Sequence, residues 1–200
     1  MSDQGIEKQN SHTKETIFRT AAHLFAQKGY NGVSMREISE QSGVTKPTIY
    51  YYFGSKEGIY EALIDSGLQQ VTSSFQDIAL VDISAKEKLV MLTKKFFQLI
   101  VEAPDFSKFF MTLAVPLSDN AVLEKFRKLM IKQGNILKTV ISEGVMSGEF
   151  GAAARPDLAT HIIGGVWQHY AWQQLAIKKK ILTDELAEEI IEILFRGLNE

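Results

Sequence analysis

The chain has 200 residues, of which 45% are hydrophobic and 23% are charged, and its formal net charge is −2 at pH 7. This composition excludes a wholly disordered chain, and the overall charge gives no hint of nucleic-acid binding. The absence of cysteine excludes a disulfide framework, a cysteine-ligated zinc site and a catalytic thiol. Residues 1–15 are polar and no apolar run reaches about 18 residues, so we expect neither a signal peptide nor a transmembrane helix. We therefore predict a cytoplasmic protein without a membrane partner.

Hydrophobic residues recur at helical spacing along most of the chain and predict an all-α fold with about nine helices. Ser34 with Glu37, and Ser84 with Glu87, have the spacing of capping boxes that begin helices. Thr45 and Ser55 are further candidate caps. We predict helices at residues 13–28, 34–42, 45–52, 55–71, 84–100, 104–116, 120–146, 156–177 and 183–197.

The second and third predicted helices are joined by a tight turn that contains Gly43. Ile38, Val44 and Ile49 are spaced to share a small core with residues 24 and 25 of the first helix. This pattern is typical of a helix-turn-helix, whose second helix lies in the major groove of DNA. If Ile49 points inward, a rotation of about 100° per residue leaves these side chains on the exposed face: Lys46, Pro47, Thr48, Tyr50 and Tyr51.

These residue types suit contact with DNA. Lys46 can neutralise a phosphate or reach a guanine edge, and Thr48 can bond a base edge or touch a thymine methyl group. The tyrosine hydroxyls can donate to phosphate oxygens. Residues 41–56 contain two lysines, Lys46 and Lys56, and no acidic residue. Arg36 either reaches the edge of the groove or pairs with Glu40 one turn later, and the sequence leaves both open.

Residues 13–60 resemble the DNA-binding domain of the TetR (tetracycline-repressor-like) family. The resemblance rests on Ala21-Ala22, Leu24-Phe25, Gly29-Tyr30, Ile38, Gly43-Val44, Thr48-Ile49-Tyr50, Phe53 and Ser55-Lys56-Glu57. One departure is Ser39, where the family usually has alanine. The resemblance implies an all-helical homodimer that represses transcription and releases DNA when a small molecule binds. With the residues argued above, it predicts these DNA-binding positions: Ser34, Arg36, Thr45, Lys46, Pro47, Thr48, Tyr50, Tyr51, Tyr52 and Lys56.

The resemblance also implies two domains, a helix-turn-helix DNA-binding domain at 1–58 and a larger effector-binding and dimerisation domain at 59–200. The helices at 156–177 and 183–197 match those that form the dimer interface. Gly164-Gly165 fits close helix approach at such a seam or room for a ligand. We expect a largely apolar or aromatic effector, and side chains with ring or thioether surface, together with a few polar groups, are the candidates to bind it. Each of them could instead belong to the ordinary hydrophobic core. The candidates are Phe110, Met111, Met130, Asn135, Trp167 and Tyr170.

Two other functional classes remain at this point. A helix-turn-helix protein with an architectural or protein-binding role needs no small effector. An enzyme needs catalytic groups, but the sequence has no nucleophile elbow, phosphate loop or paired catalytic carboxylates. His161 and His169 lie eight positions apart on one helix, which is too far to share a metal without a third element. We expect no metal, no cofactor and a near-palindromic operator with half-sites about 34–36 Å apart.

Overall fold

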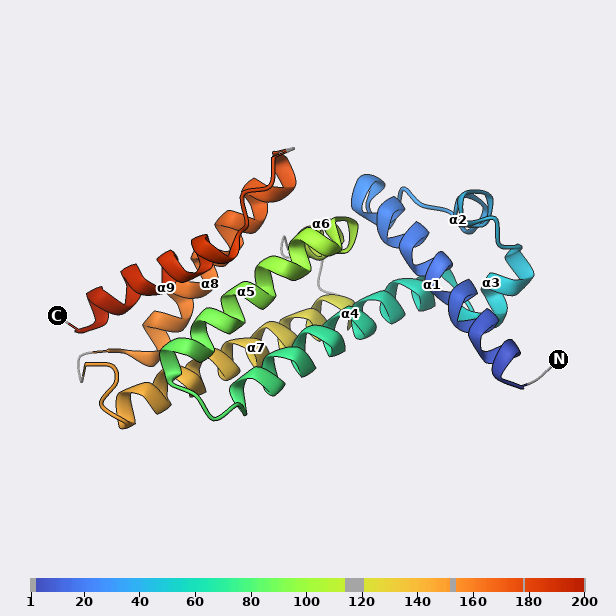
Figure 1. The fold of residues 1–200 in the computed structure, drawn as a ribbon. Coiled ribbons are helices and arrows are strands. Elements are labelled where there is room, and N and C mark those ends of the chain that lie inside the picture. The colour runs from blue at the N-terminus through green and yellow to red at the C-terminus, as the bar shows by residue number, and fades with distance from the viewer. Residues whose placement is uncertain (1–2, 114–120, 152–153, 178, 200) are drawn as a thin grey trace. The chain divides into compact units, whose positions relative to one another are not determined.

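The computed structural model describes residues 3–113, 121–151, 154–177 and 179–199, and these ranges hold nine helices and no strand. The predicted all-α class is therefore confirmed. The predicted helix ends at Pro116 and Asn120 lie outside the described residues. No helix in these ranges has both the length and the apolar character needed to cross a lipid bilayer. The helices are α1 Asp3–Lys28, α2 Met35–Ser42, α3 Lys46–Phe53, α4 Lys56–Ala79, α5 Ala85–Glu102, α6 Pro104–Leu113, α7 Ala121–Met146, α8 Pro156–Ala176 and α9 Asp184–Asn199 (Figure 1).

The predicted start of the first helix is wrong by ten residues, because α1 begins at Asp3 and not at Thr13. Residues 3–12 are polar, so they carry no hydrophobic period, yet glutamate, lysine and glutamine favour helix well. The fourth helix also extends beyond its predicted end, from Val71 to Ala79. The first helix thus continues past its hydrophobic pattern, whereas Phe75 and Ile78 extend the pattern of the fourth helix beyond Val71.

The described residues divide into two compact units. The first draws on Met1–Leu68 and Asp105–Glu124, and the second on Gln69–Pro104 and Lys125–Glu200. Helices α4 and α7 contribute to both units. The functional boundary expected at residue 58 stays a prediction, since it concerns what each part does.

An aromatic cluster lies at the centre of the first unit. The rings of Phe25, Tyr60 and Phe109 come from α1, α4 and α6, and Tyr60 meets each of the other two edge-on at 5.1 Å between centroids. Phe25 and Phe109 are fully buried. His23 Nδ1 also lies 2.9 Å from the Asp105 carboxylate, which links α1 to the first turn of α6. The helices that precede residue 58 therefore share a core with α6.

The turn between α2 and α3 is closed by local hydrogen bonds. Gly43 has φ 67°, the left-handed conformation that glycine adopts at helix ends. The Ser39 hydroxyl donates to the Val44 carbonyl at 2.7 Å, and the Val44 amide donates to the Ser42 hydroxyl at 3.2 Å. The serine that departs from the family pattern thus bridges the turn, which alanine cannot do.

Helix α5 begins at a doubly capped end in the second unit. The capping box of Ser84 and Glu87 is confirmed, with both hydrogen bonds present. The Glu149 carboxylate, from the segment after α7, accepts the amides of Ala85 at 2.8 Å and Lys86 at 3.0 Å. These bonds satisfy amides that have no partner within the helix, and they place a negative charge at the positive end of its dipole.

Gly144 and Phe150 pack closely together at the start of α5. The Phe150 ring is only 2% exposed, and a β-carbon added at Gly144 would lie 2.3 Å from it and 2.9 Å from the Ala85 side chain. Glycine is therefore required for this close approach. Helix α5 also packs against α8 and α9, so this contact fixes the start of the helix on which the second unit is assembled (Figure 1).

Candidate nucleic-acid interface

Helix α3 presents the predicted side of its surface to solvent. Ile49 is completely buried, while Tyr51 is 82% and Tyr50 is 47% exposed. Lys46 and Pro47 are exposed as well, and Thr48 is partly exposed. The inward placement of Ile49 is therefore confirmed, and the opposite side carries an ammonium group and phenol groups.

Two hydroxyl groups at the start of α3 bond to each other. Thr45 Oγ1 lies 2.9 Å from Thr48 Oγ1. Thr45 occupies the N-cap position as predicted, but its hydroxyl makes no capping bond to a backbone amide. The expected side-chain cap is therefore absent, and the paired hydroxyls form one polar group beside the exposed face of α3.

The three consecutive tyrosines have different environments. Tyr50 and Tyr51 are exposed, whereas Tyr52 is partly buried. The Tyr52 ring lies 5.3 Å from that of Tyr51 and 6.2 Å from that of Phe53, which in turn packs against Phe18 of α1. Tyr52 thus supports the orientation of Tyr51 and joins it to the interior.

Helix α2 carries a cap and an ion pair. The Ser34 hydroxyl accepts the Glu37 amide at 3.2 Å, but the Glu37 carboxylate pairs with Lys28 of α1, so the second half of the predicted capping box does not form there. Arg36 Nε donates to Glu40 at 2.7 Å, the pairing that the sequence left open. This bond raises the pKa of the Arg36 guanidinium. Both side chains of the pair are mostly exposed, so the pair costs little to separate.

The Lys56 ammonium group is directed toward the protein and not toward solvent, where a phosphate contact would lie. Its ammonium group donates to the backbone carbonyls of Tyr30 at 2.8 Å and Val33 at 2.9 Å. It also lies 4.1 Å from the centroid of the Tyr30 ring. Ser55 caps α4 as predicted, with its hydroxyl accepting the Gly58 amide at 3.0 Å. The structure therefore gives Lys56 partners within the protein that the sequence did not reveal.

The predicted effector residues fall in different parts of the structure. Phe110 and Met111 belong to the first unit and the other four to the second. Trp167 is buried, stacks on Phe96 at 4.8 Å and donates to the Thr93 hydroxyl at 3.2 Å. Tyr170 is partly buried, with its ring 6.4 Å from that of Phe97. Met130 and Asn135 lie at exposed positions of α7, and their role in binding an effector stays a prediction.

Sequence reasoning did not single out Thr72 of α4. Its side chain is 4% exposed, and among the described residues its hydroxyl has no hydrogen-bond partner. It lies one turn before Phe75, whose ring meets Trp167 edge-on at 5.8 Å. A buried hydroxyl without a partner is rare and costs about 1–3 kcal/mol. Thr72 is therefore a buried polar group without a partner among the described residues.

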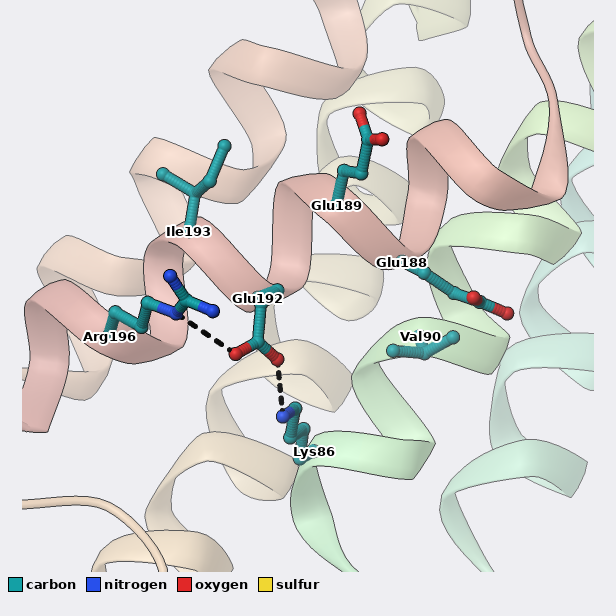
Figure 2. Close-up of a pocket in the computed structure, with 7 residues that line it drawn as sticks. All are labelled: Lys86, Val90, Glu188, Glu189, Glu192, Ile193 and Arg196. Atoms are coloured by element: carbon teal, nitrogen blue, oxygen red, sulfur yellow. Dashed lines mark hydrogen bonds and ion pairs between the residues drawn. The ribbon is translucent and has the colours of Figure 1, made fainter.

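A surface groove of about 520 Å³ lies between α5 and α9 (Figure 2). Three of its charged groups are paired with one another, since Glu192 accepts from Lys86 at 2.6 Å and from Arg196 at 3.1 Å. The bond from Lys86 is the main reason that the pKa of Glu192 is lowered. None of the predicted effector residues is among its lining residues: Lys86, Val90, Glu188, Glu189, Glu192, Ile193 and Arg196.

Comparison with known proteins agrees with the geometry of α2 and α3. A family model described as "Bacterial regulatory proteins, tetR family" matches residues 17–63. The fatty acid metabolism regulator protein of Bacillus subtilis is 27% identical over 184 residues, which cover 92% of this chain and 94% of that protein. Residues 17–63 therefore form a tetR-type helix-turn-helix domain. The protein is a DNA-binding transcriptional regulator.

Solved structures of regulators extend the likeness over more than nine-tenths of the chain. A putative fatty acid metabolism regulator of Clostridium perfringens has a TM-score of 0.81 at 26% identity, covering 91% of this chain and 97% of that one. FadR of Bacillus subtilis in complex with stearoyl-CoA has a TM-score of 0.77 at 26% identity, with coverage of 92% and 98%. These relatives are transcriptional regulators, which favours a ligand-responsive tetR regulator over an architectural DNA-binding protein.

We expect the variant Thr48→Ala to read its DNA site less selectively. Loss of the hydroxyl and methyl group should reduce discrimination at one base pair of each half-site by about 1 kcal/mol, with little change in salt dependence. Competition gel shifts with single-base variants of the selected site measure this. Unchanged discrimination at every position would show that Thr48 does not read a base.

Proposed function

We propose that this regulator represses transcription by binding a near-palindromic operator as a homodimer, and that a long-chain acyl-CoA releases it. In this proposal the protein acts in the cytoplasm, where both DNA and acyl-CoA are present. The observation that carries the DNA-binding part is the orientation of α3, with Ile49 buried and Tyr50 and Tyr51 exposed. A short helix with a buried apolar side and an exposed cationic and phenolic side fits the major groove and its phosphate borders.

Each proposed contact on DNA has a separate task. Lys46 supplies a positive charge for a phosphate or a guanine edge, and the pair of Thr45 and Thr48 presents hydroxyl groups to base edges. Tyr50 and Tyr51 donate to phosphate oxygens, with Tyr52 behind them. At the flank, Ser34 and Pro47 bring backbone close to DNA, and Arg36 leaves Glu40 for a phosphate. The contact between Arg36 and the phosphate then replaces the exposed ion pair with Glu40, which contributes little to stability.

The proposed dimer interface is an apolar stripe on α8. Leu158, Ile162, Gly165, His169 and Trp172 are spaced by three and four residues, so they share one face of the helix. Leu158 is 49%, Ile162 is 42% and Trp172 is 63% exposed. Helix α9 follows α8 in sequence, so a stripe of this kind on α8 fits the two-helix interface that the family resemblance implies. In a twofold-symmetric dimer the stripe on one protomer meets the same stripe on its partner.

The two glycines of α8 support the same surface. Apart from the adjoining residues and the backbone of α8 itself, a β-carbon added at Gly164 or Gly165 would meet no atom of the described residues within 4 Å. Glycine in a helix costs about 1 kcal/mol relative to alanine. Because nothing inside the chain requires glycine here, we assign the requirement to the second copy, whose Trp172 would occupy the notch at Gly165.

The proposed effector is a long-chain acyl thioester. Support comes from the relatives named as fatty acid metabolism regulators and from the solved FadR complex with stearoyl-CoA. The aromatic interior around Phe75, Phe96 and Trp167 suits an acyl chain, and the Thr72 hydroxyl would donate to an oxygen of the ligand. For a hundredfold loss of operator affinity, the effector must bind the DNA-released state more tightly than the DNA-bound state by about 2.7 kcal/mol.

Stearoyl-CoA tests this proposal directly. Selection from random duplexes should return a near-palindrome with half-sites about 34–36 Å apart, and stearoyl-CoA should weaken binding to it about a hundredfold. Coenzyme A without an acyl chain is the control ligand. Thr72→Val is the matched variant, and it should weaken the response to stearoyl-CoA while leaving operator affinity unchanged. Equal operator affinity with and without stearoyl-CoA would exclude acyl-CoA as the effector.

A further inference from the structure

Lys56, the first residue of α4, joins that helix to the segment between α1 and α2. Its ammonium group donates to the carbonyls of Tyr30 and Val33, at 2.8 and 2.9 Å. Tyr30 follows the end of α1 directly after Gly29, and Val33 precedes the Ser34 cap of α2. One side chain of α4 thus holds both ends of the turn from which the helix-turn-helix begins.

The turn has few other bonds to fix its shape. Its internal backbone bond, from the Val33 amide to the Tyr30 carbonyl, is long at 3.5 Å. The bonds from Lys56 are charge-assisted and are therefore stronger than neutral ones. The Tyr30 ring lies beneath the ammonium group at 4.1 Å and packs edge-on against Tyr60 of α4 at 4.8 Å. Ring and ammonium together attach the turn to α4.

We propose that Lys56 is a positioning residue, which sets the orientation of α2 and α3 on α4 and does not neutralise a DNA phosphate. This inference rests on the proposed DNA-binding function. In the positioning role the ammonium group stays on the two carbonyls and contacts no phosphate, so it adds nothing to the slope of log affinity against log salt, whereas each phosphate contact contributes about 0.9. Positioning and phosphate contact therefore predict different salt dependence.

Operator affinity measured across a range of salt concentrations separates the two roles. Lys56→Met keeps the aliphatic stem over Tyr30 and removes the charge. It should weaken operator binding about tenfold, because two carbonyls lose their donor, and leave the salt slope unchanged. Lys46→Ala, on the exposed face of α3, removes one contact from each protomer of the proposed dimer and should reduce the slope by about 2. Lys132→Met, at an exposed position of α7, is the control for loss of a distant charge.

Lys56→Arg provides a second comparison. A phosphate contact accepts arginine readily, but a site built around a compact ammonium group does not. We expect weaker binding with the wild-type slope. Wild-type affinity in Lys56→Arg, combined with a reduced slope in Lys56→Met, would overturn the proposal.

Hydrogen exchange of the DNA-free protein gives a readout that does not depend on operator binding. Amides of residues 31–38 should exchange at least several-fold faster in Lys56→Met, and at the wild-type rate in Lys46→Ala. Unchanged exchange in Lys56→Met would overturn the positioning role even if the operator proposal failed. Failure of the proposed function would appear separately, as a wild-type protein that selects no DNA site.

Discussion

Phe150→Ala is expected to lower the free energy of unfolding by about 3–5 kcal/mol, the cost of removing a large buried ring. The ring is 2% exposed and lies against Gly144, so its removal leaves a cavity inside the protein. The neighbouring Glu149 should lose its fixed position. The two hydrogen bonds that its carboxylate accepts from backbone amides at the start of α5 should then be lost as well. Chemical denaturation of the wild type and the variant measures the difference.

Gly144→Ala tests the same contact from the other side. The added methyl group overlaps a ring that has no room to withdraw, which should cost about 1–3 kcal/mol although alanine favours helix. Met146→Ala is the matched control, because Met146 lies on the same helix and is 80% exposed. Its stability should change by no more than about 0.5 kcal/mol. If Phe150→Ala behaved like this control, the close packing at the start of α5 would be excluded.

Trp172→Ala is expected to weaken the proposed dimer about thirtyfold or more. An exposed tryptophan that enters a notch on its partner has the character of a hot spot, whose truncation costs about 2 kcal/mol or more. The loss should be larger in operator binding, because a monomer forfeits the second half-site and the gain from simultaneous contact. Sedimentation across a range of protein concentrations measures the dimer, and gel shifts measure the second effect.

Gly165→Leu should have the same effect through the opposite change, because it fills the notch and adds no contact within the chain. Thermal unfolding of both variants at low protein concentration checks that each chain remains folded. Leu80→Ala serves as the control, since Leu80 is 84% exposed and lies outside α8. A wild-type dissociation constant for both Trp172→Ala and Gly165→Leu would place the interface elsewhere.

Features that depend on residues close together in sequence could be predicted well. The spacing of Ile38 and Ile49 predicts which sides of α2 and α3 are buried, and Ser84 with Glu87 predicts the start of α5, because these patterns extend over one or two helical turns. The exposed face of α3 follows from the same rotation per residue. These predictions needed no knowledge of the rest of the chain.

Partners distant in sequence could not be predicted in the same way. The sequence shows Lys56 as a cation beside a helix cap, but its carbonyl partners lie more than twenty positions earlier, and backbone carbonyls leave no mark on a sequence. Glu149 and the amides that it caps are more than sixty positions apart. Thr72 has no signal at all, since an unsatisfied hydroxyl is recognised only when its surroundings are known.

The packing of Phe25 and Tyr60 against Phe109 has a consequence for chimeric regulators. A graft of residues 1–58 onto a foreign sensor would omit both Tyr60 and α6. The ring of Phe25 would then keep Tyr30 but lose its other two aromatic neighbours, and His23 would lose its carboxylate partner. A module transplanted to bind the proposed operator therefore has to be discontinuous. It should keep its operator affinity only when Tyr60 of α4, and α6 with Asp105 and Phe109, are transferred together with the first helices.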